Sequence, residues 1–282
     1  MLEPAGERRA AVIIIPGSGP TDRDGNSPFG LNSDTYKLLA EELADAGIAS
    51  LRIDKRGLFG STEAVLDPED VSLAAYAEDT RRWVALLRER GYDCVWLAGH
   101  SEGGLVALKT AQEPAGLCGL LLLATPGRPI GDVLRAQFDT PLAAALKDPA
   151  FALIERFEAG ERIPADEIPA PLMSVFRPGV QGFLLDLLAH DPAALIAAYD
   201  GPIMIVQGTS DLQVTLADAE RLARAQPAAS LLPLADTSHM LKPVAGPGLA
   251  ANLATYSDPS MPLAPDLVPA LTAFMADRTE QP

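Results

Sequence analysis

Basic residues, cysteines, histidines and long apolar runs are all scarce in this chain of 282 residues. The 22 lysines and arginines face 38 acidic residues, and the formal net charge of −16 disfavours nucleic acid and anionic membrane surfaces as partners. No apolar run approaches the roughly 20 residues of a membrane-spanning helix, so we expect no membrane span. The first residues also lack the apolar stretch of a signal peptide, which favours a cytoplasmic protein.

The two cysteines, Cys94 and Cys118, each lie in a strand-like apolar run. Their number and spacing match neither a disulfide framework nor a metal site. We therefore expect two buried free thiols, which fits a reducing compartment.

Hydrophobic residues nevertheless make up 48% of the chain, enough for a large core. Short, almost entirely apolar runs alternate with amphipathic segments, which indicates a doubly wound α/β protein with a mostly parallel sheet. The predicted strands are Ala10–Ile15, Ile48–Asp54, Cys94–Ala98, Leu117–Ala124, Ile203–Gln207 and Ser230–Leu234. The predicted helices are Ser33–Ala46, Val71–Arg90, Glu102–Gln112, Leu216–Ala225 and Pro265–Ala276.

This alternation stops between residues 126 and 200, where prolines and glycines separate short helical pieces. A helical insert between two strands is expected to lie over the carboxyl edge of the sheet, where ligands bind in open α/β folds. We therefore divide the chain into a core of residues 1–125 and 201–282 and a predicted cap of residues 126–200. Some apolar side chains of the predicted cap should line a ligand pocket.

The segment Gly99–Gly103 reads GHSEG and matches the pattern G-x-S-x-G between a predicted strand and a predicted helix. In that context a tight turn exposes the serine hydroxyl, and the glycines remove side chains that would clash. We predict Ser101 as a nucleophile. A serine that only caps the helix is the structural alternative.

A serine hydroxyl is a weak nucleophile and needs a base within hydrogen-bond reach. Of the three histidines, His239 follows the last predicted strand, in a loop at the carboxyl edge of the sheet. His100 is the immediate neighbour of Ser101 and is expected to pack beneath the turn, while His190 lies in the predicted cap. We predict His239 as the general base.

The acid that orients the base should follow a strand and lie between nucleophile and base in chain order. Asp211 meets both conditions, because it comes after the strand Ile203–Gln207 and a glycine turn. Its carboxylate would fix the imidazole tautomer and stabilise the imidazolium. Asp236 is closer to His239 in the chain and is the alternative, with loop hydrogen bonding as its expected role.

Acyl transfer also needs two backbone donors for the oxyanion. We predict the amide of Glu102, directly after the nucleophile, and that of Ser18 in the loop Pro16–Pro20 (PGSGP). A phosphate-binding loop is the rival interpretation, but the lysine and hydroxyl pair of such loops is missing. The polar clusters Asp22–Asp24 and Asp54–Arg56 are assigned to loop architecture rather than to catalysis.

Several sequence blocks together resemble a family of bacterial α/β-hydrolases that are usually described as carboxylesterases acting on short acyl esters. The blocks are Pro16–Asn26, Arg52–Ser61, Gly99–Gly103, Gly208–Asp211, Ser238–Lys242 and Tyr256–Leu263. The resemblance implies the α/β-hydrolase fold, a triad of Ser101, Asp211 and His239, oxyanion donors at Ser18 and Glu102, and no metal or organic cofactor. The resembled fold usually opens with one or two antiparallel strands, for which nine residues before Ala10 leave little room, so we expect these strands to be absent or trimmed.

The expected function is hydrolysis of a small-molecule carboxylic ester through an acyl-enzyme. Acyl transfer to another alcohol, thioester cleavage, lactone opening and peptide cleavage use the same triad and stay open as alternatives. A catalytically inactive ligand-binding protein of the same fold is the remote one. The sequence leaves the oligomeric state open, and a homodimer is one of the possible states.

Overall fold

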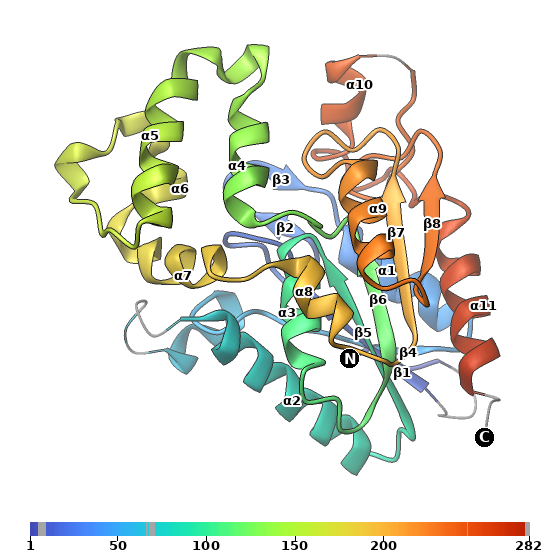
Figure 1. Cartoon of the computed structure of the whole chain (residues 1–282). Coiled ribbons are helices and arrows are strands. Elements are labelled where there is room, and N and C mark those ends of the chain that lie inside the picture. Colours follow the sequence, from blue (N-terminus) through green and yellow to red (C-terminus); the bar gives the residue numbers. More distant parts are fainter. Residues whose placement is uncertain (5–9, 66, 68–70, 247, 280–282) are drawn as a thin grey trace.

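The computed structural model describes residues 1–4, 10–65, 67, 71–246 and 248–279. The other residues, all of which belong to the predicted core, lie outside the described residues. The main sheet has six parallel strands in the order β4-β1-β5-β6-β7-β8 (Figure 1). The strands are β1 Ala10–Ile15, β4 Ala49–Arg52, β5 Cys94–His100, β6 Leu117–Leu123, β7 Ile203–Gly208 and β8 Ser230–Leu234. All six predicted strands are confirmed.

Helices cover both faces of this sheet, which confirms the doubly wound arrangement (Figure 1). They are α1 Thr35–Asp45, α2 Leu73–Glu89, α3 Glu102–Thr110, α9 Leu216–Ala225 and α11 Leu267–Thr279. Strand β1 is apolar throughout because both its faces are covered. Ile13 and Ile15 join the cluster with α2, α3 and α9, whereas Val12 and Ile14 join the cluster with α1 and α11.

A few elements are too short to leave a periodic signal in the sequence. They are the antiparallel pair β2 Asn26–Ser27 and β3 Leu31–Asn32, the 3₁₀ helix η1 Phe59–Ala64 and the helix α10 Leu249–Ala254. At the sheet edge, Leu2 forms a single antiparallel bridge with Ser50, through two backbone hydrogen bonds of 2.9 Å.

The predicted cap is helical in the described structure. It contains α4 Ile130–Phe138, α5 Lys147–Glu158, α6 Met173–Phe176, α7 Pro178–Leu188 and α8 Pro192–Ala197, with 3₁₀ turns η3 Pro141–Leu146, η4 Ala165–Glu167 and η5 Ala170–Leu172. Apolar side chains of α5, α6 and α7 form a third cluster around the stacked rings of Phe157 and Phe176. Ile130, Leu187 and Ile196, of α4, α7 and α8, belong instead to the sheet cluster with α2, α3 and α9. Figure 1 shows α4 and α5 projecting past the carboxyl ends of the strands.

The prediction of free thiols is wrong, because Cys94 and Cys118 form a disulfide. They lie at the amino-terminal ends of the neighbouring strands β5 and β6, with their Cα atoms 5.4 Å apart, and both belong to the cluster on the α1 and α11 face. The register between these strands shifts at Val95 and Trp96. Register is a tertiary property, so the sequence pattern did not reveal the pairing, and the expectation of a reducing compartment loses its support.

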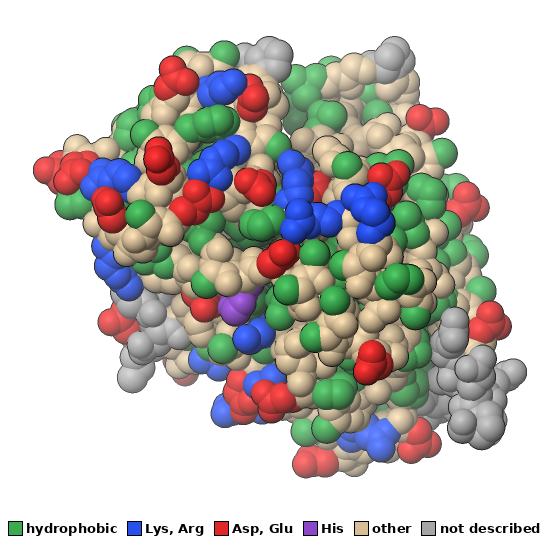
Figure 2. Space-filling view, viewed as in Figure 1, with side chains coloured by type: hydrophobic (Ala, Val, Ile, Leu, Met, Phe, Trp, Pro, Cys, Tyr) green, Lys and Arg blue, Asp and Glu red, His purple; other side chains and the backbone are tan. Residues whose placement is uncertain are grey.

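Charged side chains of both signs lie interspersed over the face shown in Figure 2. The excess of acidic residues therefore does not gather into one patch on this face. Among the helices that the structure describes, none is long and apolar enough to cross a bilayer.

Candidate active site

Ser101 lies at a sharp turn between β5 and α3, with φ 54° and ψ −123°. Such a conformation is strained for a residue with a side chain and presents the hydroxyl above the strand end. A Cβ at Gly99 would collide with the carbonyl oxygen of Gly103, and one at Gly103 would collide with that of Ile15. The close approach of strand, turn and helix therefore requires glycine at both positions.

His239 and Asp211 meet at the carboxyl edge of the sheet, in loops that follow β8 and β7. His239 Nδ1 lies 2.7 Å from Asp211 Oδ2, and both side chains are buried. The other oxygen of Asp211 accepts hydrogen bonds from the backbone N–H groups of Gln213 (2.8 Å) and Val214 (3.0 Å), and Gln207 Nε2 donates to Oδ2 over 3.0 Å. The carboxylate is thus held in one orientation.

Burial alone would raise the pKa of Asp211, but its charge interaction and hydrogen bond with His239 and the two backbone donors outweigh it and lower the pKa below the ordinary value. The group is therefore an anion at neutral pH, as an orienting acid must be. Asp236, the alternative acid, is exposed, and its backbone N–H donates to Thr209 Oγ1.

Ser101 and His239 line the same cleft, which has a volume of about 830 Å³. The Ser101 hydroxyl makes no hydrogen bond with another described residue, and bonds of this kind are often long before substrate binds. The cleft also contacts apolar side chains of the predicted cap, among them Ile130, Leu134 and Phe183. His190 lies outside it, 3.7 Å from Asp186.

The loop after β1 lies directly against Ser101, the predicted nucleophile. A Cβ on Gly17 would sit 3.3 Å from Cβ of Ser101, so only glycine leaves this approach free of crowding. Ser18 and Glu102 both line the cleft beside Ser101. Within the described part of the chain, no group accepts a hydrogen bond from the backbone N–H of Ser18 or Glu102.

His100 links the loop that contains Gly17 with the loop that contains His239. Gly17 N–H donates to Tyr36 Oη (2.9 Å), Tyr36 Oη lies 2.8 Å from His100 Nδ1, and His100 Nε2 lies 2.8 Å from the carbonyl oxygen of His239. A carbonyl only accepts, so Nε2 carries the proton and Nδ1 accepts from the tyrosine. Burial lowers the pKa of His100 to about 3, which keeps this ring neutral.

The sequence indicated that His100 packs beneath the turn but not that Tyr36 joins it. The spacing of Tyr36, Leu39, Ala40 and Leu43 marks a half-buried helix, and these side chains are buried in α1. Periodicity identifies the buried face of a helix but not which tyrosine carries a hydrogen bond.

The polar clusters near the loop hold one another. Arg23 pairs with Asp54, and Arg52 pairs with Asp24. Asp22 Oδ1 accepts from the backbone N–H groups of Asp24 and Asn26, each over 2.9 Å. These contacts fix the path of the chain between β1 and α1. In the part of the chain that the structure describes, no group of three or more His, Cys, Asp or Glu side chains could hold a metal ion.

A six-stranded parallel sheet flanked by helices, with a serine turn at its carboxyl edge, is the arrangement of the α/β-hydrolase fold. Residues 12–245 match the alpha/beta hydrolase family, and the chain belongs to this family. Esterase EstD of Thermotoga maritima is similar to it, with 29% identity over 212 residues that make up 74% of this chain and 48% of EstD. The chain thus spans about half the length of this curated relative.

Two solved structures share the fold over almost the whole chain. One is a thermophilic esterase from Thermogutta terrifontis, with a TM-score of 0.59, 19% identity and coverage of 98% of this chain and 92% of that one. The other is Est1E from Butyrivibrio proteoclasticus, solved with ferulic acid. Its TM-score is 0.59 and its identity 18%, and the match covers 98% of this chain and 92% of that one. At these identities the likeness concerns the fold.

Proposed function

We propose that this protein is a serine hydrolase that cleaves carboxylic esters of small molecules with short acyl chains. The observation that carries the proposal is the 2.7 Å contact between His239 and the buried Asp211, in a cleft that Ser101 also lines. Its family and its similarity to an esterase over 74% of its length support the same reaction class.

In the proposed mechanism, His239 takes the proton of Ser101 while the hydroxyl oxygen attacks the ester carbonyl. The amides of Ser18 and Glu102 donate to the oxyanion of the tetrahedral intermediate. The protonated His239 then gives its proton to the departing alcohol, and an acyl-enzyme remains. A water molecule, deprotonated by His239, attacks this acyl group and regenerates Ser101. Asp211 stays ionised and holds the imidazole throughout.

We retain residues 126–200 as a cap that shapes the acyl and alcohol sites. The apolar side chains that α4 and α7 contribute to the cleft favour an apolar substrate portion. The volume of about 830 Å³ belongs to a cleft large enough for a small ester together with part of its leaving group.

The test is hydrolysis of p-nitrophenyl esters from acetate to palmitate, combined with labelling by a fluorophosphonate probe. We expect turnover that peaks at short chains and covalent labelling at Ser101. Ser101→Ala should abolish labelling and lower kcat by about 10⁴-fold or more at unchanged melting temperature.

The possible outcomes separate the alternatives. Labelling without ester turnover would point to a transferase, thioesterase, lactonase or peptidase that uses the same nucleophile. A wild-type protein with neither labelling nor turnover, or a Ser101→Ala variant with native turnover, would overturn the proposal.

A further inference from the structure

A buried ion pair lies directly behind the proposed oxyanion site. Lys55 lies in the loop three residues after β4, and Glu102 is the first residue of α3; the two are 4% and 6% exposed. Lys55 Nζ lies 3.1 Å from Glu102 Oε1 and donates to the carbonyl oxygen of Gly17 over 2.6 Å. The ammonium also faces the ring of Tyr76, 5.5 Å from its centre.

The bond to the Gly17 carbonyl has a consequence for the next amide. The Gly17–Ser18 peptide is trans, so the C=O of Gly17 and the N–H of Ser18 point in opposite directions. Because Lys55 fixes the carbonyl on one side, the Ser18 N–H is fixed on the other side. The N–H of Gly17 is held as well, by Tyr36 Oη. Both neighbouring peptide planes are therefore restrained by buried side chains.

Glu102 contributes twice to the same arrangement. Its backbone N–H is the second proposed oxyanion donor, and its carboxylate is the counter-ion of Lys55. The amides of Ser18 and Glu102 are thus joined through one ion pair, although their residues are 84 positions apart in the chain. A hydrogen bond from a charged donor also polarises the Gly17–Ser18 peptide and makes its N–H a stronger donor.

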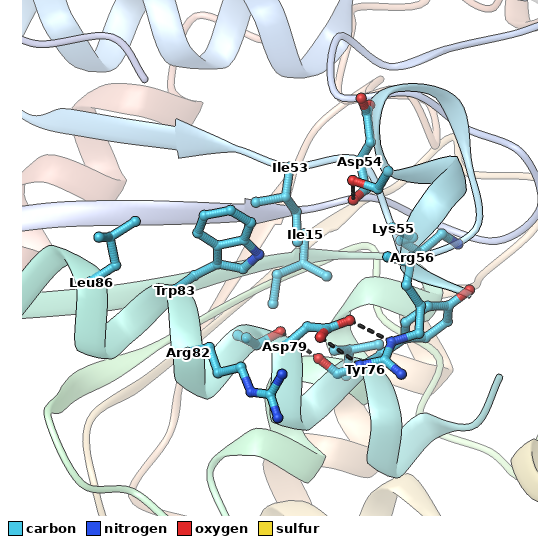
Figure 3. A pocket seen from close by; sticks show the side chains of 14 residues that line it. Ile15, Ile53, Asp54, Lys55, Arg56, Tyr76, Asp79, Arg82, Trp83 and Leu86 are labelled. Carbon is cyan, nitrogen blue, oxygen red and sulfur yellow. Dashed lines mark hydrogen bonds and ion pairs between the residues drawn. The ribbon is translucent and has the colours of Figure 1, made fainter. Parts of the chain in front are cut away.

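Lys55 lines two cavities. One is the cleft of Ser101, and the other is a smaller cavity of about 270 Å³, which Arg56 and Tyr76 also line. Figure 3 shows these three side chains together at one end of this cavity and Trp83 with Leu86 at the other. Arg56 is held separately, by two 2.6 Å hydrogen bonds to Asp79.

A buried ion pair is a weak source of stability, because removing both charges from water costs about as much as their attraction returns. Stability alone therefore does not explain why Lys55 and Glu102 form an ion pair beside the proposed oxyanion donors. We propose that Lys55 and Glu102 are positioning residues that aim the two backbone donors at the oxyanion. This inference rests on the proposed function, and it assigns a role to Lys55 that the sequence alone did not suggest.

The test compares Lys55→Met, Glu102→Gln and the double variant with wild type. Each single change leaves one buried charge without its partner and can unfold the protein, whereas the double variant removes both charges and should keep a melting temperature close to wild type. In the double variant we expect kcat on a short p-nitrophenyl ester to fall about 10- to 100-fold, with KM almost unchanged. This is less than the roughly 100- to 1,000-fold loss when an oxyanion donor is removed, because both amides are still present but less well aimed.

The readout specific to the oxyanion is the inhibition constant of a trifluoromethyl ketone, whose adduct with Ser101 carries the same negative oxygen. Its affinity should weaken by the same factor as kcat. The matched control is Arg128→Met, which removes the cation from the buried carboxylate of Asp218; neither residue lines the cleft. This control should lose stability but keep both kcat and the inhibition constant.

A folded double variant with native kcat and native inhibition by the ketone would overturn the inference while leaving the proposed function intact. An equal loss of activity in Arg128→Met would overturn it too, since activity would then follow stability alone. A wild-type protein without ester turnover or serine labelling would instead remove the proposed function itself.

Discussion

The carboxyl edge of the sheet and the predicted cap are built by different means. At the sheet edge, buried polar groups fix one another, from Asp211 to His239 and from Tyr36 to His100. In the predicted cap, a cluster of apolar side chains holds α5, α6 and α7 together, and α4, α7 and α8 also pack on a cluster of the sheet. Hydrogen bonds specify angles and distances, whereas apolar contacts mainly specify volume. The first region is suited to placing reacting groups and the second to shaping access.

We expect the largest effect when the hydrogen-bond network at the sheet edge is broken at Asp211. Asp211→Asn can no longer stabilise the imidazolium and favours the wrong tautomer of His239, so we expect kcat on a short ester to fall by about 10⁴-fold. The measurement is steady-state hydrolysis beside a melting curve. Asp236→Asn is the control and should keep native turnover, since that side chain is exposed. The opposite ranking would make Asp236 the acid.

The next prediction addresses the predicted cap. Phe176 is fully buried and stacks on Phe157 with ring centres 5.5 Å apart, so Phe176→Ala should cost about 3–5 kcal/mol of folding free energy. Leu184 of this cluster and the adjoining Leu134 and Val175 line the cleft, but none of the polar groups at the sheet edge belongs to the cluster. We therefore expect kcat on an acetate ester to stay near wild type while KM changes for longer acyl chains. Urea unfolding and the acyl-length profile measure the two effects.

The control for this change is Leu39→Ala, a buried residue of α1 that packs against the sheet. A Leu-to-Ala change of this kind should cost about 2–5 kcal/mol, yet the dependence of KM on acyl length should not shift. Equal losses of kcat for every ester in Phe176→Ala would show instead that the two regions are not separable.

The same contrast explains how far the sequence could be interpreted. Apolar runs and the strand–turn–helix context of Ser101 predicted six strands, five helices and the turn, because period and glycine spacing are local properties. The contact of His239 with Asp211 agrees with the chain-order argument. The partners of Lys55 and the Cys94–Cys118 disulfide depend on which strands lie side by side and in what register. No local pattern reveals that.

A smaller effect is expected at Tyr36, whose hydroxyl holds the loop Pro16–Pro20 with the proposed oxyanion donor Ser18. Tyr36→Phe leaves the N–H of Gly17 and Nδ1 of His100 without their buried partner, which should cost about 1–3 kcal/mol of folding free energy. The freed loop should also lower kcat by about 10-fold. Tyr199→Phe, a buried tyrosine outside the cleft, is the control and should keep native kcat. Native kcat in both variants would contradict the role of Tyr36.

The smallest effect concerns the dependence of stability on pH. His100 has a pKa of about 3 in the folded protein, against an ordinary value of 6.5, because it is buried. Between these values the unfolded chain holds a proton that the folded protein does not, so stability falls as the pH drops below about 6.5, by up to about 1.4 kcal/mol per unit.

His100→Gln keeps a donor for the carbonyl of His239 but cannot take up this proton. Urea unfolding between pH 5 and 7 should therefore give a shallower loss of stability in the variant, even if the variant is less stable at pH 7. Above pH 5 few carboxylates titrate, so the difference in slope belongs mainly to His100. Parallel slopes would mean that His100 takes up its proton in the folded state, and the neutral bridge from Tyr36 to His239 would then be wrong.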